Sequence, residues 1–216
     1  MLSVPSRFAL FPGLEVPEVD SWDALLEGLE PEERALVEAF TARYPGAFQI
    51  KSVEQLRWML ERGYPMPEEI LLAESMAVDS LIEMAKSGND KAAMLAVDRL
   101  TDTEPRVELD FFEGYERYKQ NMPLMDQLHA SCSPFGYYVA ARSPYLVNPA
   151  GFDGVGIWEL THLLAALRLG DERIEYLLNS TARENGYSRE AISLVRSYDS
   201  NISGMMRDDC KWRSFP

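Results

Sequence analysis

Apolar residues recur at helical spacing along most of the chain, and residues that cap helices divide this pattern into segments. In one such segment, Ser52 and Gln55 have the form of a capping box at a helix start. Leu56, Met59 and Leu60 then follow as a single apolar stripe. Alternation of apolar and polar residues, which is typical of strands, is nearly absent. The pattern therefore predicts an all-α fold.

The expected helices follow one another with short turns between them. Proline or a small polar residue starts most of them, and glycine ends several. The expected ranges are 22–29, 31–44, 52–62, 67–87, 91–100, a segment from Pro105 that carries Phe111, Phe112, Tyr115 and Tyr118, and then 123–131, 157–169, 171–184 and 188–200. Residues 137–141 fit either a helical turn or a short strand, and residues 143–156 form the longest candidate loop.

The N-terminal segment differs from the rest of the chain. Pro5, Pro12 and Pro17 interrupt residues 1–20, so we expect an extended arm there. The helices that follow are expected to form antiparallel pairs within a single domain spanning residues 1–216. With 216 residues, of which 46% are hydrophobic, the chain can bury a substantial core.

Two joints between expected helices share an arrangement of small and apolar residues. The first joint contains Leu81, Ala85, Gly88, Ala92 and Leu95, and the second contains Leu164, Leu167, Gly170, Ile174 and Leu177. These joints resemble those of Sel1-like and tetratricopeptide-like repeat proteins, and the resemblance implies a short, irregular α-solenoid. A compact helical domain with glycine-capped turns is the other arrangement that the pattern allows, because the glycines hold no single repeat period.

The charge of the chain is strongly acidic and unevenly distributed. The net charge is −14, which argues against nucleic acid as a ligand because phosphate binding needs clustered Lys and Arg. Residues 15–38 hold nine acidic residues and a single basic one, Arg34. Such a stretch either attracts a basic partner or is a plain solvated face. The candidate partner-binding acids are Asp23, Glu27, Glu30 and Glu33.

Aromatic residues concentrate between Phe111 and Trp158. Most of them are expected in the core. Tyr145 and Phe152 instead fall in the candidate loop, where exposed aromatic side chains could anchor a partner. A small-molecule pocket lined by the aromatic residues of 135–158 is another possible use of this region.

Each histidine follows a carboxylate by three residues. The pairs are Asp126 with His129 and Glu159 with His162, and on a helix each pair shares a face. Two such pairs resemble part of the ligand set of di-iron helical bundles, which implies a helical metalloenzyme. The chain order differs from those bundles, because residues 130–158 contain no Glu. The leading interpretation therefore includes no metal and no cofactor.

The two cysteines, Cys132 and Cys210, form neither a CxxC motif nor a disulfide framework. Apolar neighbours predict an inert, buried thiol at Cys132. The chain shows no signal-peptide pattern and no apolar run of about 20 residues, so we expect a cytoplasmic protein without membrane contact.

These features predict a non-enzymatic protein-interaction module, such as an inhibitor, a toxin-immunity protein or an adaptor. It would bind a basic protein partner through its acidic and aromatic surface. The alternative is a helical metalloenzyme that uses the Asp126/His129 and Glu159/His162 pairs.

Overall fold

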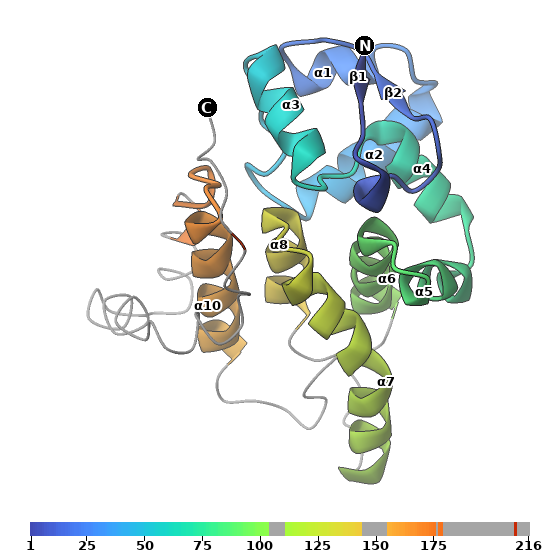
Figure 1. The fold of residues 1–216 in the computed structure, drawn as a ribbon, viewed down its shortest axis with the longest axis vertical. Coiled ribbons are helices and arrows are strands. Elements are labelled where there is room, and N and C mark those ends of the chain that lie inside the picture. The colour runs from blue at the N-terminus through green and yellow to red at the C-terminus, as the bar shows by residue number, and fades with distance from the viewer. Residues whose placement is uncertain (104–110, 144–154, 176, 179–209, 211–216) are drawn as a thin grey trace.

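The computed structural model describes residues 1–103, 111–143, 155–175, 177–178 and 210, and for residues 103, 111–118, 120 and 155–157 it describes the backbone alone. Helices dominate the described residues, and the strands among them form one two-stranded sheet. The all-α prediction is confirmed. In chain order the elements are β1 (Leu2–Ser3), the 3₁₀ helix η1 (Ser6–Phe8), β2 (Glu15–Val16), α1 (Trp22–Leu26), α2 (Pro31–Ala42), α3 (Val53–Glu61), α4 (Pro67–Ser75), α5 (Val78–Lys86), α6 (Asp90–Thr103), α7 (Phe111–Ala130), α8 (Pro134–Arg142) and α10 (Val155–Arg168) (Figure 1).

Helices that follow one another in the sequence pack side by side from α5 onward. α5 packs on α6, α6 packs on α7 and α8, and α8 lies between α6 and α10 (Figure 1). The strands, α1 and α3 lie at one end of the molecule, near α2 and α4 (Figure 1). Since α2 contacts α4 and α4 contacts α6, α4 joins the two groups of helices.

The long helix expected over residues 67–87 is two helices, α4 and α5, so this prediction is wrong. Met76 ends α4 with an extended backbone. Arg99, on α6, donates from Nη1 to the carbonyl oxygens of Ala73 at 2.6 Å, Glu74 at 3.3 Å and Met76 at 3.4 Å. The last carbonyls of a helix have no partner within the helix beyond its final turn, and here the Ala73 carbonyl also accepts from the backbone N–H of Met76 at 3.3 Å. A side chain distant in sequence therefore stabilises the break.

Two other boundaries differ from the expected ones. α7 continues through Pro123, where a new helix was expected to begin. The continuation is explained by burial, because Leu124, Met125 and Leu128 all enter the core beyond the proline. The ambiguous residues 137–141 lie within helix α8. The helices expected over 171–184 and 188–200 lie largely outside the described residues, as does the segment expected from Pro105 as far as residue 110.

The N-terminal segment folds back onto the helices. β1 and β2 pair antiparallel, with Leu2 opposite Val16. Phe8 is fully buried against Gly63, where an added Cβ would lie only 2.7 Å from the Phe8 ring. Asn89 donates from its side-chain amide to the carbonyl of Ala9 at 2.8 Å. Residues 1–20 therefore contribute to the core.

A buried ion pair connects this N-terminal segment to α4 and α6. Lys91 Nζ lies 2.6 Å from Glu69 Oε2, and both side chains are fully buried. The Glu69 carboxylate also accepts from the backbone N–H of Leu10 at 2.9 Å and of Met66 at 3.0 Å. Lys91 donates in addition to the carbonyl of Tyr64 at 2.9 Å. Each buried charge therefore has several hydrogen-bond partners.

An aromatic cluster holds the segment after α2 against the core. The cluster consists of Phe40, Tyr44, Phe48, Tyr64 and Phe135, whose rings contact one another at centroid distances of 5.0 to 6.4 Å. All five side chains are buried. Tilted and edge-on ring contacts of this kind add about 0.5–1.5 kcal/mol per pair beyond area burial. The loop that follows α2 is thus positioned by its aromatic residues.

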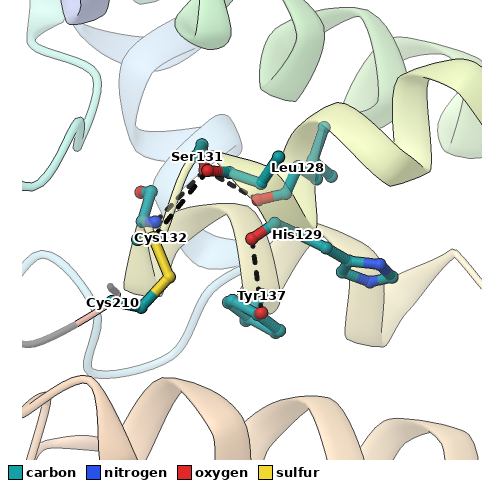
Figure 2. Close-up of a disulfide and its surroundings, with 8 residues drawn as sticks. Leu128, His129, Ser131, Cys132, Tyr137 and Cys210 are labelled. Carbon is teal, nitrogen blue, oxygen red and sulfur yellow. Dashed lines mark hydrogen bonds between the residues drawn. A yellow bond between two sulfur atoms is a disulfide. The ribbon is translucent and has the colours of Figure 1, made fainter. Parts of the chain in front are cut away.

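The cysteines form a disulfide, so the prediction of an inert thiol at Cys132 is wrong. Cys132 and Cys210 are bonded to each other, with their Cα atoms 5.3 Å apart. Cys132 lies in the turn between α7 and α8 and has a positive φ of 54°. Figure 2 shows that the His129 ring points away from the disulfide. Sequence spacing could not reveal this bond, because 78 residues separate the two cysteines.

Candidate functional site

The acidic residues of the stretch predicted from the sequence are exposed, and together they are here called the acidic face. It consists of Glu15, Glu18, Asp20, Asp23, Glu27, Glu30, Glu32, Glu33 and Glu38, and every one of these side chains is exposed. They lie on β2, α1, α2 and the turns between these elements. The four acids predicted to bind a partner all face the solvent; they are Asp23, Glu27, Glu30 and Glu33.

Several acids of this face have internal partners as well. Glu33 accepts from the backbone N–H of Glu30 at 3.1 Å, within the capping box that starts α2. Arg34 donates to Glu38 at 2.8 Å. This hydrogen bond and the charge of Glu38 raise the pKa of Arg34 above its ordinary value, and Asp23 contributes more weakly in the same direction. The N-terminal ammonium group lies 3.3 Å from Glu18 in addition. The face thus keeps a strong excess of negative charge around two paired cations.

A cleft of about 530 Å³ opens beside the acidic face, between α1, the end of α2 and the loop that follows α2. Its lining includes the acids Asp23 and Glu38, the aromatic residues Trp22, Tyr44 and Phe48, and the basic residue Lys51. The ring of Trp22 packs on that of Phe48 at a centroid distance of 4.7 Å. The cleft therefore places carboxylates beside three largely buried aromatic residues, next to a strongly negative surface.

An apolar strip on α2 leads to this cleft. Ala35, Ala39 and Ala42 recur at helical spacing and are all exposed, and Ala42 lines the cleft. Leu36, beside them, is 51% exposed and adds a larger apolar side chain to the strip. Since Glu32 and Glu38 are also exposed on this helix, α2 presents small apolar side chains among carboxylates.

The aromatic residues predicted to contact the partner, unlike the acidic ones, are not part of the described surface. Tyr145 and Phe152 lie outside the described residues. Phe135, Tyr137 and Tyr138 belong to the core and are buried to within 1% exposure. In the described part of residues 135–158, the aromatic side chains therefore serve packing, and the ligand-sized cleft lies at α1 and α2 instead.

The structure brings the two histidines together, although 33 residues separate them. His129, on α7, and His162, on α10, lie with their Nε2 atoms 3.1 Å apart. His162 Nδ1 lies 2.8 Å from the carbonyl oxygen of Trp158. Because a carbonyl only accepts hydrogen bonds, His162 carries its proton on Nδ1, and its Nε2 accepts from the Nε2–H of His129.

Aromatic rings enclose this histidine pair. The Trp158 ring lies 4.2 Å from the His162 ring, and the Tyr137 ring stacks on His129 at 5.5 Å. Burial first, and then the neighbouring His129, lower the pKa of His162 to about 3. Burial also lowers the pKa of His129, against the opposing charge of Asp126. Both imidazoles are therefore neutral at pH 7.

The carboxylates predicted to accompany the histidines lie farther out. Asp126 is exposed, and Glu159 is partly exposed. Within the described part of the chain, no group of three or more His, Cys, Asp and Glu side chains is placed to hold a metal ion together. The described residues thus bring the imidazoles into contact without assembling the carboxylate-rich set of a di-iron bundle.

Neither protein-family models, nor curated proteins, nor solved structures contain a match to this chain. The resemblance to Sel1-like and tetratricopeptide-like repeats stays a prediction. Among the described helices, none is long and apolar enough to cross a bilayer.

Sequence reasoning missed the cleft and the histidine contact for different reasons. The cleft is formed by the loop after α2, whose aromatic residues Tyr44 and Phe48 are four positions apart around a Pro-Gly turn. That spacing was an available signal for a structured loop. No comparable signal existed for the contact between His129 and His162, because it depends on how α7, α8 and α10 pack.

Proposed function

We propose that this protein is a non-enzymatic interaction module that binds a basic segment of a partner protein. The acidic face provides the long-range attraction, and the cleft beside it receives a side chain of the partner. An inhibitor, a toxin-immunity protein or an adaptor would each suit an interaction surface of this type.

The observation that carries this proposal is the position of the cleft. Its lining combines the carboxylates of Asp23 and Glu38 with aromatic residues that are themselves largely buried, chiefly Trp22, so it suits a Lys or Arg side chain of the partner. A carboxylate pairs with such a cation, and an aromatic ring face attracts it. Lys51 also lines the cleft and weakens its negative potential, which leaves the α1 and α2 side as the favoured place for the incoming charge.

The exposed charges should raise the rate of association with a basic partner more than they raise the affinity. Opposite charges at the rim of an interface speed the encounter and make it dependent on salt. The exposed Leu36 and the alanines beside it would supply the apolar contact that rim charges lack. The expected binding mode is therefore fast and salt-sensitive, with an apolar and aromatic anchor at the cleft.

A pair of matched double variants tests the proposal. The first variant combines Asp23→Lys with Glu27→Lys. Asp23 lies in the first turn of α1, and Glu27 follows the last residue of that helix. Asp79→Lys with Glu83→Lys makes the same change on α5, also from the opening turn. Both variants change the net charge equally, and α5 lies well away from α1 (Figure 1). Only the first variant alters the acidic face.

The measurement uses an arginine-rich decapeptide as a defined probe, and capture of partners from an extract of the native cells. In the wild type and in the α5 variant, the peptide should shift the indole N–H signal of Trp22, and the same proteins should be captured. In the α1 variant, we expect the shift at low salt to fall at least fivefold and the captured proteins to be lost. Equal peptide binding and capture by the two variants would show that the acidic face is a plain solvated surface.

The disulfide bears on where this interaction takes place. Disulfides persist in oxidising compartments and are rare in the cytoplasm. The Cys132–Cys210 bond therefore weighs against the cytoplasmic location expected from the sequence and favours a partner that meets this protein outside a reducing environment.

A further inference from the structure

We propose that His129 and His162 form a metal-binding pair, the dihistidine site, which chelates a divalent transition ion such as Zn²⁺ or Cu²⁺ through their two Nε2 atoms. This inference is independent of the proposed interaction at α1 and α2. It also differs from the di-iron expectation, because the donors are imidazole nitrogens rather than carboxylate oxygens.

The separation of the two nitrogens supports chelation. Two imidazoles bound to one zinc ion at about 2.05 Å and a tetrahedral angle place their nitrogens about 3.3 Å apart. The observed Nε2–Nε2 distance is 3.1 Å. A small outward movement of one ring would therefore convert the hydrogen-bonded pair into a chelating pair.

The surroundings hold both rings in place for this role. The Nδ1–H of His162 is fixed by the carbonyl of Trp158 at 2.8 Å, which directs the Nε2 lone pair toward His129. A backbone carbonyl behind a metal-bound histidine is a common way to set its tautomer and orientation. Trp158 is itself anchored, because its Nε1–H donates to the carbonyl of Ala140 at 2.7 Å. The His162 ligand is thus oriented before any ion arrives.

Protonation and access also suit an ion. Metal ligation requires neutral imidazole, and burial keeps both rings neutral at pH 7. His162 is only 1% exposed, whereas His129 is partly exposed, so an ion can approach from the His129 side. Since the described residues supply no group of three or more ligands, water or an external donor would complete the coordination.

The proton balance of binding can be written for each ring. His162 keeps its proton on Nδ1 and offers its Nε2 lone pair. His129 carries its proton on Nε2 in the free pair and must move it to Nδ1, through solvent, before Nε2 can bind the ion. Binding at pH 7 therefore releases no net proton and changes the tautomer of His129 alone. The negative charge of Asp126 acts on the His129 ring and would also attract a cation bound there.

The test uses the untagged protein with its disulfide intact, dialysed against a chelator and then titrated with ZnCl₂ or CuCl₂. The chain contains only two histidines, so every histidine ring signal belongs to this site. We expect saturable binding of one Zn²⁺ per chain, and a tighter complex with Cu²⁺, as the general order of these ions requires. Long-range ¹H–¹⁵N spectra should show His129 changing from the Nε2–H to the Nδ1–H tautomer with Zn²⁺, while His162 stays Nδ1–H.

Variants separate the dihistidine site from the acidic surface. His129→Gln should lower the affinity for Zn²⁺ at least tenfold, and Asp126→Asn should lower it by a smaller factor. The Asp23→Lys, Glu27→Lys variant should leave it unchanged. Mg²⁺, which prefers oxygen ligands, should not compete. If His129→Gln fails to fold, the tautomer change in the wild type decides the question. The proposal is overturned if Zn²⁺ does not bind saturably, if it binds equally to His129→Gln, or if the histidine tautomers do not change.

Discussion

Two lysine–glutamate pairs of this protein have the same length and opposite surroundings. Lys91 and Glu69 lie 2.6 Å apart with both side chains fully buried, whereas Lys86 and Glu83 lie 2.6 Å apart with side chains 64% and 70% exposed. The buried pair joins the N-terminal segment, α4 and α6, while the exposed pair spans one turn of α5. Burial and connectivity, rather than the distance between the charges, determine what each pair contributes.

The same distinction divides the acidic residues. Asp98 is fully buried, and its carboxylate is surrounded by Tyr44, Arg43 and Arg142, with the Arg142 Nη1 at 2.9 Å. Burial raises the pKa of Asp98, and Arg43 opposes this rise. The carboxylates of the acidic face are all exposed. Net charge counts both kinds alike, yet the buried acid contributes to the architecture and the exposed ones are available to a partner.

The largest expected effect comes from removing the two lysines in turn. Lys91→Met leaves the Glu69 carboxylate buried without its cation, and breaking a buried pair in this way typically costs about 3–5 kcal/mol. Lys86→Met removes only an exposed pair, so we expect a change within about 0.5 kcal/mol. Urea unfolding followed by circular dichroism measures both free energies of unfolding. Similar losses in the two variants would show that burial does not set the contribution of these pairs.

Alkaline pH tests the same comparison without a mutation. Burial is the first cause that raises the pKa values of Tyr44, Tyr64 and Tyr138 well above the ordinary value, and neighbouring aspartates add to it. The unfolded chain loses these protons near pH 10, so the folded state retains more protons and loses stability as pH rises further. Burial lowers the pKa of Lys91, so the folded protein loses this one proton before the unfolded chain does. For this group alone, rising pH therefore adds to stability.

The expected loss is roughly 4 kcal/mol per pH unit above about pH 11, since each of the three tyrosines contributes about 1.4 kcal/mol per pH unit, and stability should be insensitive to these tyrosines below pH 9. Urea unfolding at a series of pH values, with tyrosinate absorbance at 295 nm as the second signal, measures it. Tyr44→Phe removes one titrating group and should reduce the slope by about a third. Ionisation of these tyrosines in the folded protein near pH 10 would contradict the burial that the structure assigns to them.

Local features of this fold could be predicted, and distant contacts could not. Ser52 accepts from the backbone N–H of Gln55 at 3.2 Å, and Gly88 ends α5 with a positive φ of 91°, as the sequence predicts. Both depend on residues within one turn. The break between α4 and α5 depends on Arg99, which lies 23 residues beyond Met76. Because local propensity does not include such a partner, residues 67–87 looked like a single helix.

The candidate sites follow the same rule. Exposure of Asp23, Glu27, Glu30 and Glu33 could be predicted, since charged residues at these helix positions are rarely buried without a partner. The cleft, the His129–His162 contact and the disulfide depend on packing between elements far apart in the sequence. Glu69 illustrates the limit most clearly. It follows Pro67 and Glu68 in the first turn of α4 as a typical solvated acid would, and it is fully buried.

The smallest expected effect separates two neighbouring acids of the acidic face. Glu32 and Glu33 are both exposed in the first turn of α2, but it is the Glu33 side chain that accepts from the backbone N–H of Glu30, at 3.1 Å. Loss of a capping interaction typically costs about 0.5–1 kcal/mol, whereas an exposed charge changes stability by a few tenths. We therefore expect Glu33→Ala to lower the free energy of unfolding by about 0.7 kcal/mol and Glu32→Ala to leave it nearly unchanged. Urea unfolding of the two variants side by side resolves this difference. Equal effects would mean that the capping box adds nothing beyond the charge, and Glu33 would then be as available to a partner as Glu32.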